Sequence, residues 1–130
     1  MNVLFVEDDS MNRRVVKDML DVAGAAMTGA ESAEIGLQLI DAHDFDIVLM
    51  DLRMPGMDGL TAIKHIRARS DAKAALPVIV ITADTAVDLR EQCMRDGADE
   101  VLFKPVAMDS LFDAIGRLMA RDAQSGGTIL

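Results

Sequence analysis

The sequence predicts an α/β protein with a doubly wound parallel sheet of five strands and helices on both of its faces. Short apolar runs, typical of strands buried on both faces, alternate with segments in which apolar residues recur at helical spacing. Helical connections between successive strands favour right-handed crossovers, which keep the strands parallel. The 130 residues are enough for one domain with a core of its own.

Five apolar runs predict the strands. They lie at residues 3–6, 25–28, 47–50, 78–81 and 101–103, and the third strand is expected to begin at about Asp46. The run at 78–81 follows Pro77 and contains only valine and isoleucine, which favour strands. The run at 25–28 is the weakest, because small residues dilute its apolar pattern.

The first and third helices begin at residues that can cap or open them. Asp9 or Ser10 caps the first helix, and Gly24 stops it. The second helix covers residues 31–42, and Asp58 opens the third. The polar side chains of the third segment, which we expect to face outward, are Lys64, His65, Arg67 and Arg69.

The last two helices are expected at residues 87–96 and 108–121, and the first of them closes at Gly97. A glycine- and serine-containing stretch follows the final helix. We therefore expect one folded domain over residues 1–121 and a flexible tail over residues 122–130.

Composition argues against two classes of partner. A net charge of −9 is unsuited to binding nucleic acid or an anionic membrane, and the chain lacks the tryptophan and tyrosine that stack on bases. No apolar run is long enough to cross a bilayer. Cys93 is the single cysteine, which excludes an internal disulfide and suits a reducing compartment. We expect a cytoplasmic protein that binds neither nucleic acid nor membrane.

Polar side chains follow four of the expected strands. Glu7 and Asp8 follow the first strand and Asp51 ends the third, while Thr82 and Lys104 follow the fourth and fifth. Parallel strands end at one edge of the sheet, where α/β proteins bind ligands. We therefore expect these five side chains to lie together.

This set of side chains predicts phosphoryl transfer. Neighbouring carboxylates repel each other by about 4 kcal/mol per pair at an effective dielectric constant near 20, so they need a cation. Oxygen ligands alone suit Mg²⁺. Asp51 can then act as a nucleophile towards phosphorus and form an acyl phosphate. Lys104 and the Thr82 hydroxyl can stabilise the transferring group.

Four motifs carry a resemblance to a known family. They are Val6-Glu7-Asp8-Asp9, Met50-Asp51-Leu52-Arg53-Met54-Pro55-Gly56-Met57-Asp58-Gly59, Val80-Ile81-Thr82-Ala83 and Lys104-Pro105. In this order and at these spacings, the chain resembles the receiver domain of two-component response regulators over almost its whole length. The resemblance implies a flavodoxin-like sheet of strand order 2-1-3-4-5.

The resemblance also implies a role for each site residue. Asp51 would accept a phosphoryl group from a phosphohistidine on a sensor histidine kinase or a histidine phosphotransfer protein. Thr82, Lys104 and the Ala83 backbone N–H would contact the phosphoryl oxygens. The implied Mg²⁺ ligands are Asp8, Asp51 and the Arg53 backbone carbonyl, with Glu7 acting through water. Such a protein is no enzyme in the usual sense, because it catalyses only its own phosphorylation and dephosphorylation.

Three positions depart from or extend this pattern. Val101 stands where many receivers carry an aromatic residue three positions before the strand-five lysine, so we expect any switch to run through Thr82, the helix at residues 87–96 and backbone shifts. Arg53 and Asp84 lie two residues beyond Asp51 and Thr82, at positions that in the family influence how fast water reaches the acyl phosphate. We hypothesise that their opposite charges pair across the mouth of the site.

The expected partners are proteins. With no DNA-binding or catalytic segment after the last helix, we expect output by contact with a downstream protein target, as in phosphorelays. The residues that are candidates for a kinase-docking face are Met11, Asn12, Val15 and Val16. Helical spacing fits core packing of the three apolar ones equally well.

Two other functions stay open. A Mg²⁺-dependent phosphohydrolase of the haloacid dehalogenase kind would need a second aspartate two residues after the nucleophile, where this chain has Arg53. A pseudo-receiver scaffold that is never phosphorylated would have no chemical need for the complete acidic, hydroxyl and lysine set. Function depends on the site rather than on the fold, so the fold does not choose among them.

Overall fold

The computed structural model describes residues 1–127, with side chains up to residue 121. Five parallel strands form one sheet in the order β2-β1-β3-β4-β5, which confirms the predicted order. The strands are β1 (Asn2–Val6), β2 (Ala26–Ala30), β3 (Ile47–Met50), β4 (Val78–Thr82) and β5 (Glu100–Phe103). The three central strands are buried along nearly their whole length, as their continuous apolar runs predict.

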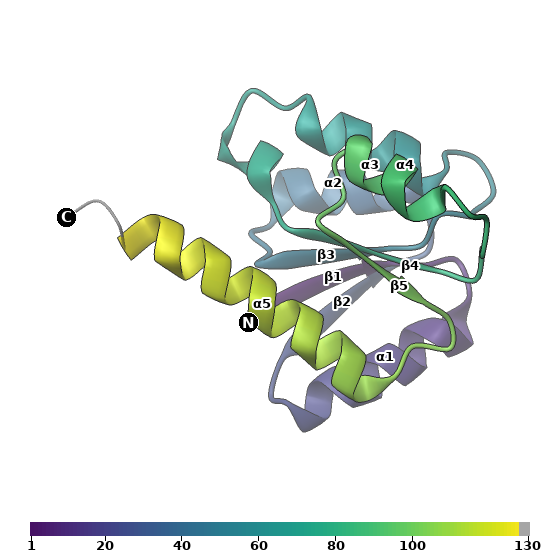
Figure 1. Cartoon of the computed structure of the whole chain (residues 1–130), viewed down its shortest axis with the longest axis horizontal. Coiled ribbons are helices and arrows are strands. Elements are labelled where there is room, and N and C mark those ends of the chain that lie inside the picture. The colour runs from purple at the N-terminus through teal and green to yellow at the C-terminus, as the bar shows by residue number, and fades with distance from the viewer. Residues whose placement is uncertain (128–130) are drawn as a thin grey trace.

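Helices cover both faces of the sheet (Figure 1). They are α1 (Ser10–Val22), α2 (Ala33–Ala42), α3 (Gly59–Arg67), α4 (Leu89–Arg95) and α5 (Met108–Gly127), with a 3₁₀ helix η1 (Ala72–Ala75) between α3 and β4. Helices α1 and α5 lie on one face, and α2, α3 and α4 lie on the other. Within the described part of the chain, no helix combines the length and the apolar character that crossing a bilayer requires.

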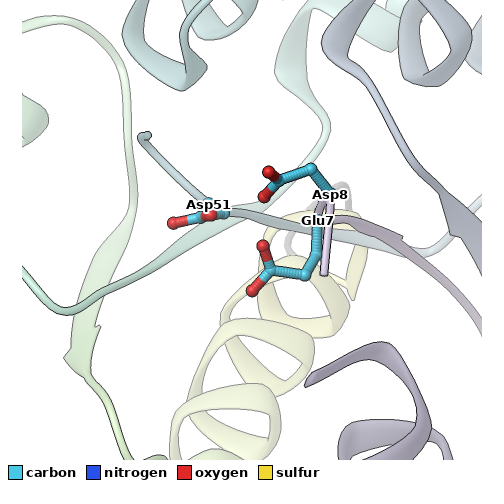
Figure 2. A group of neighbouring side chains, drawn as sticks. All are labelled: Glu7, Asp8 and Asp51. Atoms are coloured by element: carbon cyan, nitrogen blue, oxygen red, sulfur yellow. The ribbon is translucent and has the colours of Figure 1, made fainter. Parts of the chain in front are cut away.

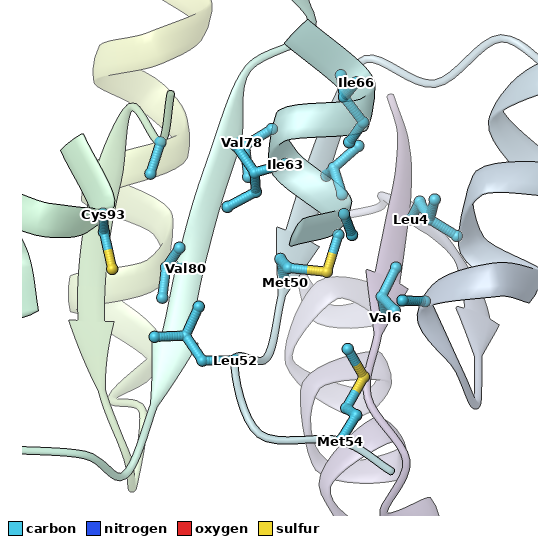
Figure 3. Close-up of a cluster of buried hydrophobic side chains, with 14 of the residues drawn as sticks. Leu4, Val6, Met50, Leu52, Met54, Ile63, Ile66, Val78, Val80 and Cys93 are labelled. Carbon is cyan, nitrogen blue, oxygen red and sulfur yellow. The ribbon is translucent and has the colours of Figure 1, made fainter. Parts of the chain in front are cut away.

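The two faces of the sheet support two separate cores, because successive strand residues point to opposite sides. Val6, Met50 and Val80 pack against α2, α3 and α4 (Figure 3). Phe5 and Ile81 pack against α1 and α5. Cys93 is fully buried in the first core, as a small apolar side chain would be, and burial raises the pKa of its thiol.

Helix α4 begins two residues later than the sequence predicts. Asp84 accepts a hydrogen bond from the Ala86 backbone N–H at 3.0 Å, and this local turn competes with helix formation. Val87, which we expected within the helix, is 98% exposed in the loop before it. The late start leaves α4 only seven residues long.

Helix α5 continues beyond Arg121, where we expected it to end, and reaches Gly127. Its backbone therefore covers most of the stretch that we assigned to a flexible tail. Residues 128–130 of that stretch lie outside the described residues. The flexibility of residues 122–130 stays a prediction.

The expectation that Arg67 faces outward is wrong. Its guanidinium donates to the carbonyl oxygens of Gly97, Ala74 and Leu76 at 2.7–2.9 Å, and it pairs with Asp99 at 3.0 Å. Arginine carries five hydrogen-bond donors at the end of a long apolar stem. From the end of α3, its side chain can therefore reach carbonyl oxygens of other segments and donate hydrogen bonds to them. Helical spacing shows the face from which a side chain starts, and cannot show where such a long side chain ends.

Candidate functional site

The carboxyl ends of β1, β3, β4 and β5 border an open cleft of about 570 Å³. It contains all of the strand-end residues that the sequence singled out, which therefore lie together as expected. The residues that line the cleft are Glu7, Asp8, Asp9, Asn12, Asp51, Arg53, Thr82, Ala83, Asp84, Thr85 and Lys104.

Asp51 is held at the end of β3 with little freedom. Its backbone N–H donates to the Val6 carbonyl at 3.0 Å, and its side chain is only 6% exposed. Helix α3 begins directly against its backbone, because a Cβ at Gly59 would lie 2.2 Å from the Asp51 carbonyl oxygen. The sheet on one side and the glycine at the start of α3 on the other fix the backbone from which this carboxylate projects.

Three carboxylates gather in the cleft (Figure 2). Glu7, Asp8 and Asp51 each present an oxygen, and these atoms all lie within 4.8 Å of one another. Asp8 is exposed, whereas Glu7 is 1% exposed. Asp9, the next acid along the chain, accepts hydrogen bonds from the first turn of α1 as its N-cap.

The two carboxylate oxygens of Glu7 have different surroundings. Oε1 accepts hydrogen bonds from Lys104 Nζ at 2.7 Å and from Asn12 Nδ2 at 3.0 Å. Oε2 is buried and has no hydrogen-bond partner among the residues that the structure describes. A buried charged oxygen without a partner is costly, so the site favours an additional positive or hydrogen-bonding group beside it.

Lys104 is the ammonium group that faces the carboxylates. Its Nζ lies 3.5 Å from Asp51 Oδ1 as well as 2.7 Å from Glu7. Burial opposes its charge, but the hydrogen bond to Glu7 and the attraction of Asp51 outweigh this and raise the pKa of Lys104. The ammonium group therefore stays protonated at neutral pH.

Thr82 and Ala83 line the cleft at the end of β4. Thr82 is fully buried, and its hydroxyl oxygen accepts a hydrogen bond from the Asp84 backbone N–H at 3.1 Å. The hydroxyl proton is thus available to a group in the cleft.

Arg53 and Asp84 form an ion pair, as hypothesised from their positions. Arg53 belongs to the loop after β3, and Asp84 belongs to the loop after β4. The hydrogen bond from Arg53 lowers the pKa of Asp84, with a contribution from the Ala86 N–H. Both side chains line the cleft, so the pair links its two walls.

The residues of the cleft fit a magnesium ion. Three carboxylates face one ammonium group, so the cluster keeps an excess of negative charge. One of its oxygens is buried without a described partner. Mg²⁺ prefers oxygen ligands of this kind, whereas softer metals prefer histidine or cysteine.

Sequence reasoning missed the contribution of α1 to the site. Asn12 bonds the Glu7 side chain, and the Arg13 guanidinium donates to the Glu7 carbonyl at 2.6 Å. The predicted helix cap at Asp9 could have indicated this contribution, because a helix that begins there must turn its first residues towards the end of β1.

The residues proposed for docking differ in exposure. Met11 is 68% exposed and Val15 is 43% exposed, whereas Val16 is buried against the sheet. Core packing therefore explains Val16 but neither of the other two apolar residues.

Val101 is buried and pairs with Val80 on the neighbouring strand.

Comparison with known proteins relates the chain to response regulators and sensor proteins. The sequence pattern of the "response regulator receiver domain" matches residues 3–116. The response regulator protein FleR of Pseudomonas aeruginosa is 38% identical over 115 residues, which are 88% of this chain and 24% of FleR. The virulence sensor protein BvgS of Bordetella bronchiseptica is 32% identical over 127 residues, which are 95% of this chain and 10% of BvgS.

A solved structure shares both fold and sequence features. The receiver domain of a sensor histidine kinase from P. aeruginosa has a TM-score of 0.81 and 30% identity, covering 89% of this chain and 94% of that one. That structure holds a magnesium ion coordinated in its active-site cleft. The chain spans no more than a quarter of the two whole proteins above, so the similarity concerns only part of each.

Proposed function

Because the chain belongs to the response regulator receiver domain family, we propose that Asp51 accepts a phosphoryl group from a phosphohistidine. The observation that carries the proposal is the placement of Asp51 itself. Its nearly buried carboxylate lies in the cleft with Lys104 Nζ 3.5 Å from one of its oxygens. A carboxylate in such a position can attack phosphorus, as in other aspartyl-phosphate proteins.

The transfer exchanges one bond for another. An Asp51 oxygen forms a bond to phosphorus, and the bond between phosphorus and the histidine nitrogen breaks. The electron pair stays on that imidazole nitrogen, which takes up a proton from solvent. Lys104 balances the charge on the phosphoryl oxygens, and the Thr82 hydroxyl and Ala83 backbone N–H donate hydrogen bonds to them.

We propose that the reaction depends on Mg²⁺, which, when bound, neutralises charge on the phosphoryl group. Asp8, Asp51 and the Arg53 carbonyl would hold the ion directly, and Glu7 would act through water. The unpartnered oxygen of Glu7 and the excess of carboxylates over ammonium groups support this assignment. The P. aeruginosa receiver with magnesium in its cleft adds independent support.

The donor and the target are proposed to be proteins. Sensor proteins are among the relatives, and a sensor histidine kinase carries the similar receiver structure, so a histidine kinase or a histidine phosphotransfer protein is the proposed donor. We propose a phosphorelay role, with output through contact with a downstream protein. A single buried cysteine suits a reducing compartment, so we place the reaction in the cytoplasm.

The test is the intact mass of the protein after incubation with acetyl phosphate, with and without Mg²⁺. The parent should gain one phosphoryl group only with Mg²⁺. Asp51→Asn should gain none, because the amide oxygen is a far weaker nucleophile than the carboxylate. Asp18→Asn, which changes an exposed acid of α1, is the control and should behave as the parent does.

Two results of the mass measurement would contradict the proposal. No adduct on the folded parent at high donor and Mg²⁺ concentrations would favour an unphosphorylated scaffold. An adduct that persists in Asp51→Asn would place the acceptor on another residue.

A further inference from the structure

The loop between β3 and α3, residues 51–58, is held by a side chain from α2. Glu34 lies in the first turn of α2, and its Oε1 accepts a hydrogen bond from the Met57 backbone N–H at 3.1 Å. The hydrogen bond from Glu34's own backbone N–H, followed by that from Met57, lowers the pKa of the carboxyl group. Glu34 is therefore a charged acceptor at neutral pH, which makes the bond to the loop stronger than a neutral one.

The Glu34 carboxylate also lies beside the bend of the loop at Gly56. Gly56 has φ +81°, a backbone conformation that residues with a side chain rarely adopt. A Cβ at this position would lie 3.3 Å from Glu34 Oε1. The carboxylate thus contacts the bend and bonds the residue after it.

The same loop carries Arg53, whose carbonyl is the proposed backbone ligand of the metal. Leu52 and Met54 on either side are 6% and 8% exposed, so the start of the loop is anchored in the core (Figure 3). The bend at residues 56–57 lies farther out, where Glu34 holds it. Helix α2 is a firm support, because Ala33 beside Glu34 is fully buried.

We propose that Glu34 is a positioning residue for the metal site. It holds the β3–α3 loop, which carries the proposed Arg53 carbonyl ligand, although Glu34 itself does not line the cleft. The inference rests on the proposed Mg²⁺ dependence. It adds a residue of α2, a helix that supplies none of the proposed ligands.

Titration of the metal-free protein with MgCl₂ by calorimetry tests the proposal. Glu34→Ala should raise the dissociation constant of Mg²⁺ by up to about tenfold, the lower end of what loss of an outer-shell partner costs. Glu34→Gln keeps an oxygen that can accept from Met57 and should stay within about twofold of the parent. Glu31→Ala removes an exposed carboxylate just before α2 and should also stay close to the parent.

Amide hydrogen exchange of Met57, measured by NMR without metal, provides a second readout. Exchange should become faster in Glu34→Ala and stay near the parental rate in Glu34→Gln and Glu31→Ala. Unchanged Met57 exchange, or an unchanged Mg²⁺ affinity in Glu34→Ala, would overturn the proposal. So would an equal loss of affinity in Glu31→Ala, because the effect would then be one of charge alone. A parent that does not bind Mg²⁺ would instead refute the proposed metal dependence, and this inference with it.

Discussion

At the scale of single residues, Arg53 and Asp84 form the link between the two walls of the cleft. Arg53→Ala removes the pair but keeps the backbone carbonyl proposed to bind the metal. We expect the phosphorylated variant to lose its phosphoryl group several-fold faster than the parent, because water reaches the acyl phosphate more easily. The measurement is the decay of the phosphorylated mass after the donor is removed.

Two further variants separate gating from a general change of charge. Asp84→Asn breaks the ion pair but keeps an oxygen that can accept from the Ala86 N–H, so it should accelerate the decay as well. Arg95→Ala removes an exposed cation at the end of α4 and should leave the decay unchanged. Decay of Arg53→Ala at the parental rate would show that this pair does not gate the site.

Single residues also show where sequence reasoning reaches its limit. Asp51, Thr82 and Lys104 could be placed in one site because strand ends in a parallel sheet share an edge. The contact from Glu34 to Met57 joins residues 23 positions apart and depends on how α2 is oriented on the sheet. No periodicity in the sequence encodes that orientation, so this residue could be found only in the structure.

At the scale of elements, Glu100 joins two helices to the edge strand β5. Its carboxylate accepts from Arg90 of α4 at 2.9 Å and from Arg117 of α5 at 3.1 Å. Burial opposes the charge of Glu100, but the two arginines and the Val101 N–H outweigh it and lower the pKa of the carboxyl group. Because α4 is short and its N-cap makes no side-chain hydrogen bond, this network is an important part of its attachment.

The lowered pKa of Glu100 predicts a dependence of stability on pH. A carboxyl group with a pKa lower in the folded than in the unfolded state stabilises the fold above its ordinary value of 4.5. This contribution is lost as the pH falls through the folded pKa. We therefore expect the free energy of unfolding of the parent to fall more steeply below pH 4.5 than that of Glu100→Gln.

Denaturant unfolding at several pH values between about 3 and 6 measures this difference. All other titrating groups are present in both proteins, so the difference between the two pH profiles reports the titration of Glu100 alone. At neutral pH the parent should be the more stable of the two, and added salt should narrow the gap by screening. Parallel pH profiles for the two proteins would show that the network adds no net stability.

Elements differ in how far their sequence defines them. The apolar runs of β1, β3 and β4 predicted their strands to within a residue, because burial on both faces leaves an uninterrupted signal. The 3₁₀ helix η1 was not predicted. It depends on Asp71, which accepts from the Lys73 N–H, and on Lys73 Nζ, which donates to the Ile40 carbonyl at 2.6 Å. Such contacts between distant segments leave no periodic pattern.

At the scale of the whole molecule, the sheet determines which surface surrounds the cleft. Helix α1 starts directly after β1, so its first turns lie beside the acidic cluster, and its last turn lies at the opposite end of the sheet. Both ends of α1 carry exposed apolar side chains, Met11 and Val15 near the cleft and Val22 far from it. The helix therefore offers a test of the docking face together with a matched control.

We predict that the double variant Met11→Ala, Val15→Ala slows phosphorylation by a protein donor but not by acetyl phosphate. A protein must cover the surface around the cleft to bring its phosphohistidine to Asp51, whereas the small donor needs only the cleft. Rates of transfer from a purified histidine phosphotransfer protein that phosphorylates the parent provide the measurement. Val22→Ala removes an apolar side chain that is 74% exposed and should leave both rates unchanged. If the double variant and Val22→Ala respond alike to the protein donor, the partner does not contact this end of α1.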